Sequence, residues 1–224
     1  MKALAPFCHD IMPVPPGSMY CSRGSPFRKF HRPTWSNPGD FSPRPSALED
    51  IRTTLTQSVS KRLAKVSSWG ILLSGGVDCS IVASVAVGEQ RRTGPDVETH
   101  SFAIGLEGDP HLEPAQCTAG YLGTSHHAVI VSPKEARDAV MDAIYHLESF
   151  DVRTIRAGIM MYLLARKVKS FGIKLVLNGD GSDAIFAGYD HFRNAPNAEA
   201  LHREVIKGVG DIHNFDALRA TRPP

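Results

Sequence analysis

Short aliphatic runs alternate with longer amphipathic stretches from residue 46 onward, and this alternation predicts strands and helices in turn. Nearly continuous apolar runs, which suit buried parallel strands, occur at 70–74, 99–104, 127–131 and 175–178. Helical periodicity occurs at 46–63, 77–85, 112–122, 133–150, 154–171 and 198–208. We therefore expect an α/β fold, with a doubly wound parallel sheet and helices on both of its faces.

The first predicted helix has a local start signal. Ser46 is followed three residues later by Glu49, which is the spacing of a capping box. One apolar face is formed by Leu48, Ile51, Leu55, Val59 and Leu63. Nine of the sixteen prolines precede residue 46, so residues 1–45 are expected to be extended. A hairpin is expected there between 19–22 and 27–31, with its turn at Arg23 and Gly24.

A candidate anion site lies where the 70–74 strand meets the next helix. Ser74, Gly75 and Gly76 form the turn, and glycine lets the backbone approach a ligand closely. The helix that follows presents free N–H groups and a positive dipole end. Ser80 adds a hydroxyl donor, and Asp78 adds a carboxylate able to hold Mg²⁺ beside a phosphate. The pattern predicts a pyrophosphate cradle, although an ordinary Ser-Gly-Gly loop is the alternative.

A second acidic loop follows the 175–178 strand. Asp180 lies between two glycines, and Asp183 follows three residues later. Two close carboxylates are costly unless they share a cation or a proton, and the carboxyl edge of an open α/β sheet is where ligands bind. We expect Asp78 and Asp183 to hold one Mg²⁺, leaving Asp180 for proton transfer or for orienting a nucleophile. An acidic surface loop with Gly-Asp-Gly turn chemistry is the alternative.

The two loops resemble the ATP-pyrophosphatase (PP-loop) superfamily, and their pairing resembles the synthetase domain of glutamine-hydrolysing asparagine synthetase. The first carries Ser-Gly-Gly-Val-Asp-Cys-Ser, and the second Asn-Gly-Asp-Gly-Ser-Asp-Ala-Ile-Phe-Ala-Gly-Tyr. Further segments are similar to the family in order and spacing: 100–106, 121–127, 144–148, 153–157, 161–167 and 194–197. The resemblance covers nearly the whole chain.

The resemblance implies a site and a reaction. Adenosine and the α-phosphate would be held by Leu72, Ser74, Gly75, Gly76, Ile104 and Gly179. Asp78 and Asp183 would bind Mg²⁺ on the leaving pyrophosphate, with Cys79 and Ser80 near it. Thr154 and Arg156 lie on the stretch that the family uses near pyrophosphate and the aspartyl group, and Asp180 completes the expected catalytic set. ATP would adenylate the side-chain carboxylate of aspartate, or of a similar acid, and ammonia would then form the amide.

Several positions depart from the family pattern. The family has glutamate where Asp180 stands, and a second glutamate where Ala184 stands. Arg153 replaces a threonine, Asn178 a serine and Ala187 a glycine. These changes leave an alternative open, in which the chain is a degenerate, weakly active or inactive fragment that binds a nucleotide or a partner protein.

The resemblance also predicts the domain organisation. Residues 1–45 resemble the connector that follows the glutaminase domain, and 46–224 resemble part of the synthetase domain. Lys2 stands where a glutaminase would need its nucleophilic cysteine. We expect an internal slice of a synthetase, without the glutaminase domain and without the C-terminal part. Ammonia would then come from solution, from a separate glutaminase or from a full-length homologue.

Composition adds little to this interpretation. A net charge of +2 gives no reason to expect nucleic acid or an anionic membrane as a partner, and no window approaches the roughly 20 apolar residues of a membrane span. The cysteines lack metal-site spacing, which suits reduced thiols in the cytoplasm: Cys8, Cys21, Cys79 and Cys117.

Histidines and methionines within the predicted elements are expected to be structural. His100, His126 and His127 lie on strands that enter the sheet, so we expect no metal cluster there. Met160 and Met161 occur at helical spacing with leucines, which predicts core packing.

Overall fold

The computed structural model of the chain describes residue 7 and residues 14–24, 27–33, 46–93, 98–149 and 151–211. Two compact units are present, and each is described by itself. One is Arg44–Asp180, and the other combines Met1–Pro43 with Gly181–Pro224. The predicted division into a connector over 1–45 and a synthetase domain over 46–224 stays a prediction.

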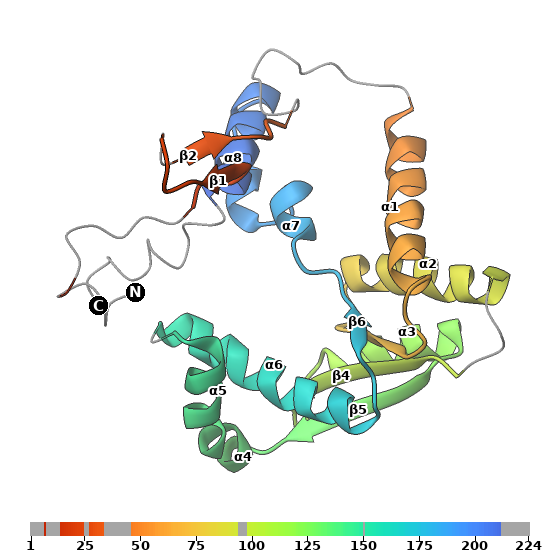
Figure 1. Cartoon of the computed structure of the whole chain (residues 1–224). Coiled ribbons are helices and arrows are strands. Elements are labelled where there is room, and N and C mark those ends of the chain that lie inside the picture. Colours follow the sequence, from red (N-terminus) through yellow and green to blue (C-terminus); the bar gives the residue numbers. More distant parts are fainter. Residues whose placement is uncertain are drawn as a thin grey trace. The chain divides into compact units, whose positions relative to one another are not determined.

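The unit Arg44–Asp180 is built on a four-stranded parallel sheet. Its strands lie in the order β5-β4-β3-β6 (Figure 1). The bounds are β3 Trp69–Leu72, β4 His100–Leu106, β5 Ser125–Val131 and β6 Leu175–Leu177. In register, Ile71 of β3 pairs with Ser101 of β4 on one side and with Leu177 of β6 on the other. Because all four strands are parallel, their carboxyl ends lie at the same end of the sheet.

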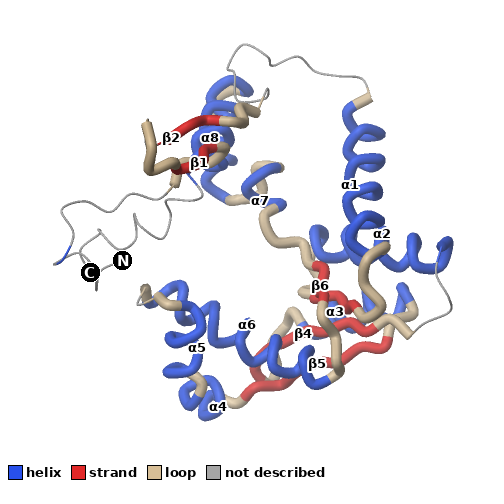
Figure 2. Tube along the Cα trace, in the orientation of Figure 1, coloured by secondary structure: helices blue, strands red, loops and turns tan. Residues whose placement is uncertain are grey.

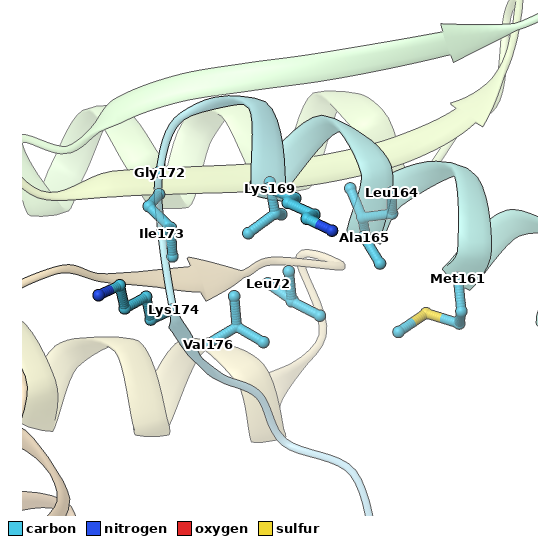
Figure 3. A pocket seen from close by; sticks show the side chains of 10 residues that line it. Leu72, Met161, Leu164, Ala165, Lys169, Gly172, Ile173, Lys174 and Val176 are labelled. Atoms are coloured by element: carbon cyan, nitrogen blue, oxygen red, sulfur yellow. The ribbon is translucent and has the colours of Figure 1, made fainter.

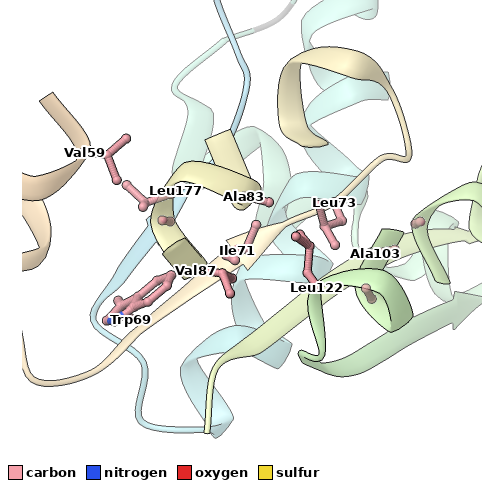
Figure 4. Packing of buried hydrophobic residues seen from close by; sticks show 12 residues of the cluster. Val59, Trp69, Ile71, Leu73, Ala83, Val87, Ala103, Leu122 and Leu177 are labelled. Carbon is pink, nitrogen blue, oxygen red and sulfur yellow. The ribbon is translucent and has the colours of Figure 1, made fainter. Parts of the chain in front are cut away.

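Helices cover both faces of this sheet, as the alternation of apolar runs predicts. The helices of the unit are α1 Ala47–Leu63, α2 Val77–Thr93, α3 Leu112–Leu122, α4 Pro133–Asp138, α5 Val140–Leu147 and α6 Val152–Ser170. Helices α2 and α3 pack into one cluster with Ile71 and Leu73 (Figure 4). Helix α6 packs against β4 on the other face, around Leu72 and Phe102 (Figure 2). The predicted doubly wound α/β fold is confirmed.

Alternation along β3 and β4 divides the core between the two faces. Phe102 is fully buried toward α6, with Leu164 and Val168, while its neighbour Ala103 faces the α2 side. Ile71 is fully buried on that same α2 side. Burial of a side chain of this size contributes about 1.5–3 kcal/mol. The strand residues are therefore apolar on both faces, which is why each predicted strand reads as a continuous run.

Helix α1 differs from the prediction at its start. Ser46 makes no capping bond to the backbone, because its backbone is not extended (φ −85°, ψ 5°) and its hydroxyl donates to Asp50 Oδ2 at 3.0 Å. The predicted capping box is wrong there. A capping box forms instead at Ser132, whose hydroxyl accepts from Glu135 N–H at 3.2 Å while Ser132 N–H donates to Glu135 Oε2 at 2.8 Å. The Ser132 N–H bond, together with a second bond that the Ser132 hydroxyl donates to Glu135 Oε2 at 2.7 Å, lowers the pKa of the Glu135 carboxyl.

The apolar face of α1 is only partly used within its unit. Val59 is buried, whereas Leu48 is 84% exposed. The helix is held to α2 through Ser60, whose hydroxyl donates to Glu89 Oε2 at 2.6 Å. Bonds from Arg92 and then Ser60 lower the pKa of Glu89 to about 2.

The predicted helix over 133–150 is in fact two helices, α4 and α5, which meet at Ala139.

The second unit contains the predicted hairpin and the C-terminal helices. Strands β1 Ser18–Tyr20 and β2 Phe27–Lys29 pair antiparallel, with Met19 opposite Arg28. The C-terminal part holds α7 Ser182–Ile185, η3 Asp190–Asn194 and α8 Ala198–Asp211. The described cysteines, Cys21, Cys79 and Cys117, are free thiols, and Cys8 lies outside the described residues. No helix of the described segments is long and apolar enough to cross a membrane.

The three histidines of β4 and β5 lie in two polar contacts within the sheet. On one face, His100 Nδ1 lies 3.2 Å from His127 Nε2, next to Phe171. On the other, His126 Nδ1 lies 2.9 Å from Ser101 Oγ, while its Nε2 is buried without a partner among the described residues. Burial, and then the neighbouring ring, lowers the pKa of both His126 and His127 below the usual 6.5.

Stability should therefore fall in mild acid. A lowered pKa means that the folded state keeps these rings neutral, while the unfolded chain takes up protons from about pH 6.5 downward. The histidine contribution is full above pH 6.5 and is lost as the pH drops toward the folded-state pKa. Urea unfolding at pH 7.5 and pH 5.5 measures the loss. His126→Gln should reduce it, and His146→Gln, at an exposed position, is the control. Equal pH dependence in both variants would contradict this assignment.

Ala187 should carry backbone strain. Its φ of +57° is in the left-handed region, where the family pattern has glycine. Ala187→Gly is expected to stabilise the second unit by about 0.5–1 kcal/mol, because glycine has no Cβ to clash. Urea unfolding or native-state hydrogen exchange measures the change. Ala184→Gly, at a buried helical position, should destabilise instead. A loss of stability in Ala187→Gly would show that the strain is absent.

Candidate functional site

The first loop of the candidate site leaves β3 and turns sharply into α2. Leu73 still donates to Phe102 O at 2.8 Å, so the sheet ladder continues to the start of the turn. Gly75 follows with φ +78°. A Cβ on Gly75 would lie 2.5 Å from Pro114 Cβ and 2.8 Å from Ala115 N, at the start of α3. Glycine is therefore required both by conformation and by the close approach to α3.

The second loop presses against the first. A Cβ on Gly179 would lie 2.6 Å from Cys79 N and 2.7 Å from the backbone carbon of Asp78. These distances leave no room for a side chain, so the loop after β6 packs backbone to backbone on the first turn of α2. The parallel pairing of β3 with β6 produces this contact, because both loops begin at the carboxyl ends of these neighbouring strands. The Ser-Gly-Gly turn and residues 178–180 of the second motif thus meet within the unit Arg44–Asp180.

A cavity of about 290 Å³ opens between these loops and the end of β4. Five of the predicted site residues line it: Leu72, Ser74, Cys79, Ile104 and Asp180. Much of the remaining wall is apolar and comes from Phe102, Met161 and Leu164. An apolar slot with polar groups at its loop end is suited to a flat, partly apolar ring joined to an anionic group.

Hydrogen bonds fix the polar groups around this cavity. Ser74 Oγ lies 3.4 Å from Cys79 Sγ, whereas Ser80 Oγ donates to Gly76 O at 2.7 Å. Asp180 Oδ2 accepts from Asn178 Nδ2 at 2.7 Å. The Ser80 hydroxyl thus donates its proton within the first turn of α2, and Asn178 orients the Asp180 carboxylate. Of these groups, Ser74, Cys79, Asn178 and Asp180 line the cavity.

The two predicted metal ligands lie in different units. Asp78 is half-buried in the first turn of α2, and its carboxylate has no hydrogen-bond or ion-pair partner among the described residues. Asp183 is exposed in the first turn of α7, with Oδ1 against Gly188. Uncommitted carboxylate oxygens are the ligands that Mg²⁺ prefers, so each residue fits the expected ion. Their joint coordination of one ion stays a prediction, because each unit is described by itself.

Thr154 and Arg156 lie near the start of α6 and do not line the cavity. The backbone N–H and the hydroxyl of Thr154 each donate to Asp151 Oδ2 at 2.8 Å, which caps the helix. Arg156 is exposed two residues farther along. Asp151 is thus the N-cap of α6 and Thr154 donates to it, while the predicted ligand roles of Thr154 and Arg156 stay predictions.

The structure adds lining residues that the sequence did not single out. Asp109 and His111 follow β4, and Asp109 Oδ1 accepts from His111 N–H at 2.9 Å. Their signal was available, since they follow a predicted strand at its carboxyl end. Met161 was expected in the core but is 44% exposed and lines the cavity. That prediction was wrong, because helical spacing alone does not show which residues of α6 pack in the core and which line a cavity.

Comparison with known proteins places the chain in a family. Residues 50–222 match the sequence pattern of the family described as Asparagine synthase. The chain belongs to the asparagine synthase family. It is 42% identical to a probable asparagine synthetase [glutamine-hydrolyzing] of Schizosaccharomyces pombe and 40% identical to asparagine synthetase B [glutamine-hydrolyzing] of Escherichia coli. Both alignments cover 99% of this chain and 42% of the relative, so the chain spans about two fifths of their length. The family resemblance predicted from the two loops is confirmed.

The close contact at Gly179 should make that position intolerant of any side chain. Gly179→Ala is expected to destabilise the unit by about 1–3 kcal/mol, since the new methyl group overpacks the backbone of Asp78 and Cys79. Gly88→Ala is the matched control, because a methyl group there meets nothing within 4 Å and lies in helix α2. It should raise stability by about 1 kcal/mol through helix propensity. Urea unfolding of both variants measures the difference, and equal effects would contradict the described loop contact.

Proposed function

We propose that this chain carries the nucleotide-binding and adenylating site of an asparagine synthetase-type ligase, which uses ATP to activate the side-chain carboxylate of aspartate for amide formation. The observation that carries the proposal is the contact of Gly179 with Asp78 and Cys79, which joins both family loops around one cavity. Membership in the asparagine synthase family supports the same reaction class.

ATP would bind with its base in the apolar slot and its phosphates on the Ser-Gly-Gly loop. Leu72, Ile104 and Met161 supply apolar walls for the adenine ring. Gly75 and Gly76 keep side chains away from the phosphates, and the start of α2 directs free N–H groups toward them. This arrangement would hold the α-phosphate close to the loop while leaving it open to attack.

The reaction would proceed in two displacements. A carboxylate oxygen of aspartate attacks the α-phosphorus, the bond to the β-phosphate oxygen breaks, and pyrophosphate leaves. Ammonia then attacks the acyl carbon, a proton is lost, and the carbon–oxygen bond to AMP breaks to give the amide. Asp180 would orient ammonia or take its proton, and its position in the cavity lining and its bond from Asn178 support this role.

Mg²⁺ is proposed at Asp78 and Asp183. The family resemblance implies the ion, and the uncommitted carboxylate of Asp78 fits it. When bound, the ion would offset the negative charge that develops on departing pyrophosphate. Asp78 would hold it beside the phosphate end of the cavity.

The described cysteines are free thiols, which suits a reducing compartment such as the cytoplasm. Ammonia would come from solution, from a separate glutaminase or from a full-length homologue.

The direct test is pyrophosphate release by the purified chain with ATP, Mg²⁺, aspartate and ammonium. Release that depends on aspartate, with AMP formed in equal amount, is the expected result. Omission of each component in turn supplies the controls, and other carboxylic acids replace aspartate to define the substrate. Folded protein that binds ATP but releases no pyrophosphate would overturn the adenylation proposal and leave a nucleotide-binding module.

Substitution of Asp78 should separate metal binding from folding. Asp78→Asn removes the charge that would hold Mg²⁺ and should lower pyrophosphate release at least about 100-fold. Asp138→Asn, an exposed position paired with Lys134 on α4, is the matched control and should be unchanged. Activity that survives in Asp78→Asn would contradict the metal assignment.

Lengthening the Asp180 side chain should preserve or raise activity. The family has glutamate at this position, and a displacement of about 1 Å in a positioned catalytic group can cost on the order of 100-fold. Asp180→Glu restores that reach, whereas Asp180→Asn removes the charge and should lower the rate. Steady-state rates of pyrophosphate and amide formation in the two variants measure the effect. Equal rates for Asp180→Asn and the unsubstituted chain would exclude a role for this carboxylate.

A further inference from the structure

Strand β6 forms one edge of the sheet. It pairs with β3 on one side and is the last strand in the order β5-β4-β3-β6. Within the described part of the unit Arg44–Asp180, no strand pairs with its other side. An edge of this kind presents backbone N–H and C=O groups that can pair with another extended chain.

An apolar groove of about 630 Å³ lies beside this edge, between β6 and α6 (Figure 3). Leu72, Ile173 and Val176 line it from the sheet side, and Leu164 and Ala165 line it from α6. Val176 belongs to β6 itself, so the groove lies directly beside this strand. A backbone edge and an apolar groove side by side are the two features that strand addition requires, since main-chain bonds give affinity and alternate side chains fill the groove.

Charge defines the chemistry of the occupant. Lys169 and Lys174 are the charged residues that line the groove, and no acidic residue of the described segments lines it. Both lysines are exposed, and neither ammonium group has an ion-pair or hydrogen-bond partner among the described residues. A segment that carries carboxylates would complement them.

A second copy of this chain fits poorly on the same edge. β6 of a second copy, with Lys174 before it and Asn178 after it, offers no carboxylate to these lysines. We infer that the edge of β6 and the groove beside α6 bind an extended acidic segment of a different polypeptide, with aliphatic side chains at alternate positions and Asp or Glu against Lys169 and Lys174.

The groove shares a wall with the cavity between the two glycine loops. Leu72, Met161 and Leu164 line both spaces. The inferred partner would therefore lie next to the proposed nucleotide site without occupying its loops. The inference depends on the sheet edge and the lysines, so it does not require the proposed ligase activity.

A synthetic peptide provides the test. Fluorescein-labelled Glu-Thr-Val-Thr-Val-Thr-Glu places its valines and both glutamates on one face of an extended strand, with a carboxylate at each end, so it suits either strand direction. Fluorescence anisotropy with the full chain should show saturable binding. The same peptide N-methylated at every internal residue has no internal amide N–H on either edge of the strand and should not bind. Equal binding of the N-methylated peptide, or no binding of the acidic peptide to folded protein, would overturn the inference.

Paired variants locate the site. Lys169→Glu combined with Lys174→Glu should weaken binding roughly tenfold and should restore binding to a peptide with lysine at both ends. Lys61→Glu combined with Lys65→Glu gives the same change of net charge away from the groove and should leave binding unchanged. Ala165→Phe, at an exposed helical position, fills the groove without a change of charge and should abolish binding, with circular dichroism confirming the fold.

Two outcomes would contradict the location or the partner. Binding that is indifferent to both the charge reversal and Ala165→Phe would place the peptide elsewhere. A concentration-dependent dimer in light scattering that Ala165→Phe dissociates would make a second copy of this chain the occupant.

Discussion

The contact between Gly179 and the backbone of Asp78 and Cys79 is the constraint on which the site depends. It brings together loops that lie far apart in the sequence, and it tolerates no side chain. The contact follows from the parallel pairing of β3 with β6, which ends both strands at one edge. Gly75 adds a second close approach, to the start of α3. Backbone packing thus sets the positions of the two loops, and these loops carry the side chains that we predict to be functional.

The two faces of the sheet pack against different helices and contribute to different parts of the surface. Helices α2 and α3 pack on the face of Ile71 and supply the helix starts that surround the Ser-Gly-Gly loop. Helix α6 packs on the face of Phe102, and its Met161 and Leu164 line both the cavity between the two loops and the groove at β6. One helix therefore links the proposed chemistry to the inferred binding surface.

The sequence was sufficient for the sheet, the glycine loops and the family, because each depends on local residue type. Continuous apolar runs identify strands that are buried on both faces, and Ser-Gly-Gly after such a run marks a loop at the sheet edge. The start of α1 and the exposure of Met161 were predicted wrongly, since they depend on backbone angles and on packing between distant elements. Asp109 and His111 follow a predicted strand at its carboxyl end, but their residue types alone do not distinguish cavity-lining residues from other polar loop residues.

Strand order also has a consequence for synthesis of the chain. β3 is the first strand of the sheet to leave the ribosome, and β6 is the last. Until β6 arrives, one edge of β3 is without its partner, although Ile71 of β3 is fully buried in the finished core. Sheets closed by such distant pairing form late, and their partly built edges invite association with other chains. The nascent polypeptide is therefore most vulnerable to aggregation in the interval before residue 177 emerges, which is when a chaperone would be most useful to it.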